Sequence, residues 1–128
     1  MDRPSVLVVD DEPQVVWVLE FSLRSEGYET YTAHDGVEAL DQVRRHHPAY
    51  MVLDVMMPRM DGWSVLVELA KLPADERPLV VMVTALASLA DRAKAQALGA
   101  AGYVPKPFDI DELIGSRRGS VGGPVADA

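Results

Sequence analysis

Near its beginning the chain reads VLVVDDEP over residues 6–13. Four consecutive apolar residues are typical of a strand that is buried on both faces of a parallel sheet, because a half-exposed strand would alternate apolar and polar residues. Asp10 and Asp11 follow this run directly, and Pro13 suits the first turn of a helix. The stretch therefore predicts a buried strand, an acidic turn at its carboxyl end, and then a helix.

The same succession of strand and helix recurs along the rest of the chain. Short apolar runs predict further buried strands at residues 51–53, 79–83 and 102–104, while residues 28–33 alternate ring and polar groups like an edge strand. The residues that open the later helices are predicted to be Asp35, Asp61, Ser88 and Asp109. Repeated alternation predicts an α/β fold with a doubly wound, five-stranded parallel sheet in the order 2-1-3-4-5, and five helices on its two faces.

The first helix is expected to begin at Pro13 and to be closed by Gly27. Its apolar stripe is predicted to consist of Val15, Val16, Leu19, Phe21 and Leu23. Such a stripe would pack against the sheet.

The last helix is expected to be short, because it opens at Asp109 but already meets Gly115. Residues 119–128 are small and rich in glycine, so they predict a disordered tail. The expected organisation is one domain over residues 1–118, followed by this tail. Such a chain fits either a stand-alone domain or a fragment of a longer protein.

The composition is that of an ordinary globular domain, with 128 residues, of which 48% are hydrophobic and 25% charged. The formal net charge of −8 has the wrong sign for direct nucleic-acid binding. Without cysteine, neither disulfides nor a thiolate metal site can form. We see no secretory signal pattern and no apolar run near the ~18 residues of a membrane span. We therefore expect a cytoplasmic protein with no membrane partner.

Polar residues interrupt the apolar runs at one end of each central strand. Asp10 and Asp11 follow the first strand, Asp54 the third, Thr84 ends the fourth, and Lys106 comes just after the fifth. The carboxyl ends of parallel strands lie at one edge of a sheet, where ligands bind at the point at which strand order reverses. These five residues are therefore predicted to form one site.

Three carboxylates at this edge would repel one another, by about 4 kcal/mol for a pair at ~4 Å and an effective dielectric constant of about 20. Oxygen ligands without histidine or cysteine favour a hard cation, so we predict Mg²⁺, with Mn²⁺ as the alternative. Asp54 is then the best-placed nucleophile for phosphoryl transfer. Lys106 would pair with one phosphoryl oxygen and Thr84 would donate its hydroxyl to another, giving an acyl phosphate as the product.

The segments that carry these residues resemble the receiver domains of two-component response regulators. The matching segments are VLVVDDEP at 6–13, LDVMMPRMDG at 53–62, VTALAS at 83–88 and GAAGYVPKPF at 99–108. With the strand and helix pattern between them, the resemblance covers nearly all of residues 5–114. It implies a flavodoxin-like (CheY-like) fold and a regulatory domain instead of an enzyme.

The resemblance also implies roles for the site. A histidine kinase or phosphotransfer protein would phosphorylate Asp54, and Asp10, Asp11 and Asp54 would bind Mg²⁺ together with the backbone carbonyl of Met56. The bond before Pro107 would be cis.

A switch is implied as well, in which the Thr84 hydroxyl moves toward the phosphoryl group and the Tyr103 ring turns inward. This movement would alter the face formed by the fourth helix, fifth strand and fifth helix, where a downstream protein or a second copy would bind. Met56 and Leu86, which follow Asp54 and Thr84 by two positions, are expected to shield the phosphoryl group from water.

Three other functions share parts of this pattern. A phosphatase of the haloacid dehalogenase type needs a second acid two residues after its nucleophile, but Met56 stands there, and counting from Asp10 instead gives only Glu12. A flavodoxin-type cofactor binder needs a glycine-rich loop after the first strand, where acids stand here. A degenerate receiver that acts unphosphorylated would lack a site residue, and none is lost.

Overall fold

The computed structural model describes residues 3–109, 111 and 113. Its strands are β1 (Ser5–Val9), β2 (Glu29–Ala33), β3 (Tyr50–Leu53), β4 (Leu79–Thr84) and β5 (Gly102–Pro105). Its helices are α1 (Pro13–Ser25), α2 (Gly36–His46), α3 (Gly62–Leu69) and α4 (Leu89–Ala97), with a single 3₁₀ turn, η1 (Ala74–Glu76), before β4.

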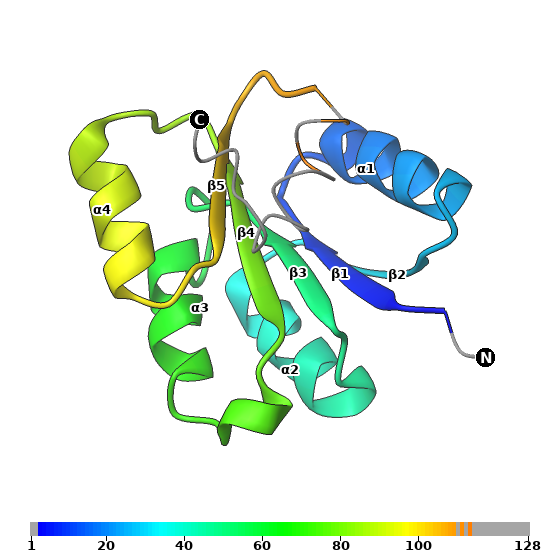
Figure 1. Cartoon of the computed structure of the whole chain (residues 1–128), viewed down its shortest axis with the longest axis horizontal. Coiled ribbons are helices and arrows are strands. Elements are labelled where there is room, and N and C mark those ends of the chain that lie inside the picture. Colours follow the sequence, from blue (N-terminus) through cyan, green and yellow to red (C-terminus); the bar gives the residue numbers. More distant parts are fainter. Residues whose placement is uncertain (1–2, 110, 112, 114–128) are drawn as a thin grey trace.

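All neighbouring strands pair in parallel, in the order β2-β1-β3-β4-β5 (Figure 1). The predicted strand order is therefore confirmed. The last residue of β1, Val9, is level with both Ala33 of β2 and Leu53 of β3. This register brings the residues that follow β1 and β3 to the same height at the carboxyl edge of the sheet.

The sheet buries a hydrophobic core on each face, because successive side chains of a strand point to opposite sides. In β1, Leu7 and Val9 pack on the side covered by α2, α3 and α4, while Val6 and Val8 pack on the side covered by α1. The strands thus present apolar side chains to both layers of helices, as their uninterrupted apolar sequences predict.

The predicted helix starts are also present. The side chains of Asp35, Asp61 and Ser88 each accept the N–H of the residue three positions later, at 2.8, 2.9 and 3.0 Å respectively. These caps satisfy backbone donors that a helix leaves unpaired in its first turn.

After β5, the Asp109 side chain accepts the N–H of Asp111 at 2.8 Å, and the buried Leu113 donates its N–H to the Asp109 carbonyl at 3.1 Å. The rest of the predicted last helix, and the tail predicted over 119–128, lie outside the described residues. The predicted domain limits, 1–118, therefore stay a prediction.

One part of the predicted apolar stripe of α1 is wrong. Val16, Leu19 and Leu23 face the sheet, but Phe21 is 62% exposed and stacks on Trp17, with ring centroids 5.6 Å apart. Phe21 lies two residues from Leu19, and two residues turn a helix by about 200°, so both cannot face the sheet. Across the described part of the chain, no helix is long and apolar enough to cross a membrane.

Candidate functional site

Three aspartates meet at the carboxyl edge of the sheet. One carboxylate oxygen each from Asp10, Asp11 and Asp54 lies within 4.8 Å of the others. Asp10 and Asp54 are 2% and 4% exposed, whereas Asp11 is exposed. The strands set this arrangement, because the Asp54 N–H donates to the Val9 carbonyl at 3.0 Å and continues the pairing of β1 with β3.

Lys106 reaches into this cluster from the end of β5. Its Nζ donates to Asp10 Oδ2 at 2.8 Å, and it lies 3.3 Å from both Asp54 Oδ2 and Glu12 Oε1. The Lys106 N–H donates to the Thr84 carbonyl at 2.8 Å, which ties the residue to the end of β4. The following bond to Pro107 is cis, the isomer that the resemblance implies.

The electrostatics of the cluster keep the lysine charged. Burial lowers the pKa of Lys106, but the hydrogen bond to Asp10 and the charge of Asp54 outweigh it, so the pKa is raised overall. For Asp54, burial raises the pKa, the charge of Asp10 raises it further, and Lys106 opposes both. The ionisation of Asp54 and that of Lys106 therefore depend on each other.

The loop from residue 54 to 61 leads from Asp54 to α3 and is tightly packed against the strand end. The Val55 N–H donates to Asp54 Oδ1 at 2.8 Å and orients the carboxylate. The Gly62 N–H donates to the Val55 carbonyl at 2.8 Å. A Cβ on Gly62 would collide with the Asp54 carbonyl oxygen, so only glycine allows this approach.

Thr84 and Tyr103, the predicted switch residues, both form hydrogen bonds to the backbone of Leu86. The buried Thr84 Oγ1 accepts the Leu86 N–H at 3.3 Å, and the Tyr103 hydroxyl donates to the Leu86 carbonyl at 2.7 Å. The guanidinium carbon of Arg92 lies 5.2 Å from the centre of the Tyr103 ring. The segment before α4 is therefore connected to both the site and β5.

The donor atoms of the cluster fit a hard divalent cation. Three carboxylates, from Asp10, Asp11 and Asp54, lie beside one ammonium, from Lys106, which also contacts Glu12, so negative charge is in excess at the site. A divalent cation would reduce this excess, and the ligands would be oxygens alone, as Mg²⁺ prefers. Met56 follows in the loop with its side chain 61% exposed, and the role of its carbonyl as a ligand stays a prediction.

Two contacts of this region were absent from the sequence prediction. The sequence offers Glu12 only as a second acid after Asp10, but in the structure Glu12 contacts Lys106. The sequence predicts Asp35 only as a helix cap, but in the structure Asp35 also binds Arg59, for which the sequence predicts no role. The order of residues along the chain carries no direct signal for either contact, because both join separate segments.

Comparison with known proteins decides the family. Residues 6–117 match the model of the response regulator receiver domain. This chain belongs to the response regulator receiver family. Receivers are regulatory domains of two-component signalling systems. Aspartate phosphorylation and Mg²⁺ binding are general features of this family, and its members interact with histidine kinases. The match favours this interpretation over the phosphatase and the cofactor binder.

Relatives of the receiver include regulators of about twice its length. It is 46% identical over 113 residues to the probable transcriptional regulator ycf27 of Cyanophora paradoxa, and the matched region covers 88% of this chain and 46% of the relative. It is 44% identical over 113 residues to the response regulator MprA of Mycobacterium avium, covering 88% and 49%. The chain thus spans about half the length of these curated relatives.

Solved receiver structures share its fold. The Francisella response regulator 1452 receiver domain has a TM-score of 0.83 and 34% identity, covering 91% of this chain and 94% of that one. The receiver domain of the sensor histidine kinase PA1611 from Pseudomonas aeruginosa has a TM-score of 0.83 and 29% identity, covering 94% and 99%. That structure has a magnesium ion coordinated in its active site cleft.

Proposed function

We propose that this receiver accepts a phosphoryl group on Asp54 from a histidine kinase or phosphotransfer protein and signals through the face formed by α4 and β5. The observation that carries the proposal is the position of Asp54, buried at a strand end, beside two further carboxylates and 3.3 Å from the Lys106 ammonium. A single aspartate at a strand end could equally well cap the following loop, but the neighbouring carboxylates and ammonium suit a nucleophile.

Asp10, Asp11 and Asp54, together with the Met56 carbonyl, would hold Mg²⁺, or Mn²⁺ in its place. When bound there, the cation would neutralise charge on the phosphoryl oxygens and on the aspartates. The carboxylate cluster supports this assignment because its charge and its oxygen ligands suit such an ion.

The residues of the chain supply the remaining parts of the reaction. An Asp54 oxygen attacks the phosphorus in line, the new O–P bond forms, and the bond from phosphorus to the donor's imidazole nitrogen breaks, with its electron pair passing to that nitrogen. Lys106 Nζ, which now donates to Asp10, would pair with one phosphoryl oxygen. The Thr84 hydroxyl would donate to another, because a hydroxyl that accepts one bond can still donate its hydrogen.

The output follows from the shared contacts of Leu86. If the Thr84 hydroxyl turns to the phosphoryl group, the Leu86 N–H loses its acceptor, and the segment before α4 shifts. Tyr103 would follow, because its hydroxyl is bonded to the Leu86 carbonyl. This would bias an equilibrium between two arrangements of the α4 and β5 face.

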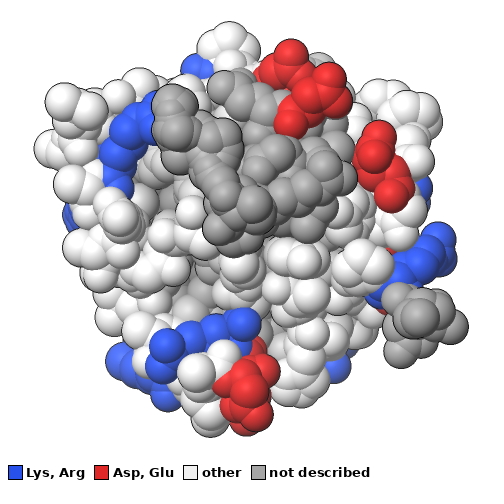
Figure 2. Space-filling model, viewed as in Figure 1, with Lys and Arg blue, Asp and Glu red and all other residues white. Residues whose placement is uncertain are grey.

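A downstream protein or a second copy of the receiver would bind this face, with the predicted fifth helix completing it. Figure 2 shows basic side chains over α4, which would help to select the partner. We propose that the receiver acts in the cytoplasm and makes no direct contact with nucleic acid, in keeping with its net charge of −8.

The direct test is intact mass after incubation with MgCl₂ and acetyl phosphate, with Asp54→Asn in parallel. We expect one phosphoryl adduct on the wild type, absent in the variant and absent when EDTA is added first. No adduct even in large excess of donor would overturn the proposal and favour a degenerate receiver that binds its partner without phosphorylation. An adduct that persists on Asp54→Asn would place the modification elsewhere.

A further inference from the structure

The loop over residues 54–61 carries both Asp54 and Met56, so its backbone path matters for the acidic site. Its carboxyl-terminal end is anchored by Gly62, whose N–H donates to the Val55 carbonyl at 2.8 Å. Its outer side meets the start of α2, where the Gly36 N–H donates to the Met60 carbonyl at 3.1 Å. A Cβ on Gly36 would lie 2.5 Å from that same oxygen, so the two backbones are in close contact.

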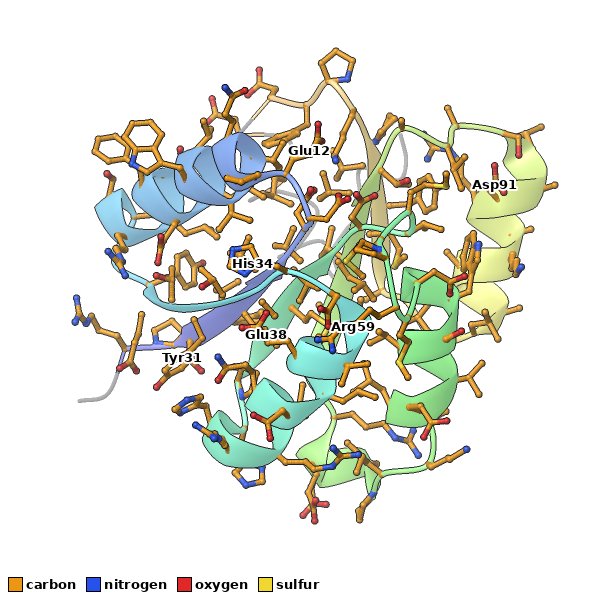
Figure 3. The ribbon with its side chains drawn as sticks, turned by 180° about the vertical axis from the view of Figure 1, so that it is seen from behind. Glu12, Tyr31, His34, Glu38, Arg59 and Asp91 are labelled. Carbon is orange, nitrogen blue, oxygen red and sulfur yellow. The ribbon has the colours of Figure 1, made fainter. Side chains whose placement is uncertain are left out.

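Arg59 joins the same loop to α2 through its side chain. Its Nε and Nη2 lie 2.8 and 2.7 Å from Asp35 Oδ2. The other carboxylate oxygen of Asp35 accepts the Glu38 N–H at 2.8 Å. One carboxylate thus caps α2 with one oxygen and holds the loop with the other, and Figure 3 shows Arg59 and Glu38 together at the start of this helix.

The backbone of Arg59 has a conformation that is unusual for an arginine. Its φ of 66° lies in the left-handed region, which is unfavourable for an L-residue and which glycine enters freely. An arginine stands where the backbone favours glycine, so backbone preference does not account for this residue. The bonds of its guanidinium to Asp35 offset the unfavourable conformation.

The Asp35–Arg59 ion pair also differs from the surface pairs of the domain. The Asp35 side chain is 12% exposed and the Arg59 side chain 62%, whereas both members of the pair between Lys71 and Glu68 are more open than Asp35, at 65% and 37%. Exposed ion pairs contribute little to stability, and the contribution rises when one partner is fixed and desolvated. Asp35 is fixed by its capping bond, so little side-chain entropy is lost in binding Arg59.

We propose that Asp35 and Arg59 form a latch that positions the loop between β3 and α3 for cation binding at the acidic site. The inference rests on the proposed function, in which Asp54 and the Met56 carbonyl bind Mg²⁺. With Val55 held by Gly62 and Arg59 held by Asp35, only a short segment around Met56 lies between two anchored points. A ligand that is already positioned loses less conformational freedom on binding, so the cation binds more tightly.

The principal variant is Arg59→Gly, because glycine removes the guanidinium and at the same time relieves the positive φ. We expect its dissociation constant for Mg²⁺, measured by calorimetric titration with MgCl₂, to rise about threefold to tenfold, the range of one partly buried ion pair. The melting temperature of the metal-free protein should stay close to that of the wild type. Loss of affinity without loss of stability is not expected of a merely structural residue.

Four further variants sharpen the test. Asp35→Ser keeps a helix cap but cannot reach Arg59, and should weaken Mg²⁺ binding to the same extent as Arg59→Gly. The double variant should bind no more weakly than either single one, because both remove the same interaction. Arg59→Lys should restore part of the affinity. Lys71→Ala is the control, because it removes an ion pair with Glu68 that involves no residue of the loop, and it should leave the Mg²⁺ affinity unchanged.

Hydrogen exchange of the metal-free protein gives a readout that needs no cation. The amides of Met60 and Gly62 should exchange faster in Arg59→Gly and Asp35→Ser than in the wild type, and those of β1 should not change.

The outcomes separate the latch from the function on which it rests. If the wild type binds Mg²⁺ and both variants bind within a factor of two of it, with unchanged exchange of the loop amides, the latch is overturned and the proposed function stands. If the wild type itself binds no Mg²⁺, the proposed metal site fails, and the latch as a device for cation binding fails with it.

Discussion

The Lys106 ammonium lies 3.3 Å from Asp54 Oδ2, although 52 residues separate the two along the chain. It also donates to Asp10 Oδ2 at 2.8 Å, so one cation contacts two buried carboxylates. This contact offsets the repulsion between the two carboxylates, and it makes the stability of the domain and the proposed phosphorylation of Asp54 depend on the same side chain.

Replacing Lys106 by methionine should therefore destabilise the metal-free protein. Asp10 and Asp54 would lose their partner, at a cost of roughly 2 kcal/mol in the free energy of unfolding at pH 7. The pKa of Lys106 is raised above its usual 10.5, so its contribution is complete below that pH and is lost as pH rises through the folded value. Urea denaturation with EDTA and with Mg²⁺ is the measurement. Equal stability of wild type and variant in EDTA would contradict the prediction.

Asp54→Asn should have the opposite effect and stabilise the metal-free protein at pH 7, by about 1 kcal/mol for relief of one like-charge contact. Burial and Asp10 raise the pKa of Asp54 above its usual 3.8, so the folded wild type loses stability as pH rises from there through the folded pKa. The difference between variant and wild type should shrink toward acid pH. Asparagine keeps an oxygen for the Val55 N–H, so a less stable variant would show that the carboxylate charge is favourable here.

Asp35→Asn is expected to lower stability at pH 7 by about 0.5–1 kcal/mol, because asparagine still caps α2 but no longer forms an ion pair with Arg59. The bond from the Glu38 N–H and then Arg59 lower the pKa of Asp35 below 3.8, although its burial opposes them. Its contribution is thus present above the unfolded pKa and is lost as pH falls through the folded one. Denaturation curves at pH 7 and near pH 2 should show the difference only at the higher pH. A difference that persists in acid would point to the cap instead.

Gly62→Ala should destabilise the domain by about 1–3 kcal/mol, because the added methyl group would collide with the backbone of Asp54. Phosphorylation from acetyl phosphate should slow as the site is displaced. Gly99→Ala is the matched control, since Gly99 has a φ of 107° but open space around its Cβ position. Its cost should come from the backbone alone, and an equal loss of phosphorylation in this control would contradict the steric explanation.

A polar residue in place of Met56 should shorten the lifetime of the phosphoryl group. Met56 follows Asp54 by two residues and is 61% exposed, and an apolar side chain beside the phosphoryl group would restrict the approach of water. We expect Met56→Asn to dephosphorylate a few-fold faster, about 1 kcal/mol in the barrier, when the decay of the phosphorylated mass is timed after removal of donor. Met57→Asn, one position along the loop, serves as the control. An unchanged or longer lifetime for Met56→Asn would remove the shielding explanation.

Much of the fold was predictable from short segments. The run from Val6 to Val9 indicated a strand buried on both faces, and Asp35, Asp61 and Ser88 indicated helix starts that the structure confirms. These signals are local, because a strand or a capped helix satisfies its backbone within a few residues or with any parallel neighbour. The apolar character of Phe21 wrongly predicts that it faces the sheet, because its position two residues from Leu19 places it on the other side of α1.

The chemical types in the acidic site were also predictable, since Asp10, Asp54 and Lys106 each follow a strand that ends at one edge. Which of these residues contact one another was not predictable. That Lys106 contacts Asp10 and Asp54, that the Tyr103 hydroxyl reaches the Leu86 carbonyl, and that Arg59 reaches Asp35 follows from how separate segments are brought into register. Periodicity and capping specify the succession of strands and helices because they act over a few residues. Contacts between groups that are 17 to 96 residues apart form only once the sheet is assembled and its strand ends are level.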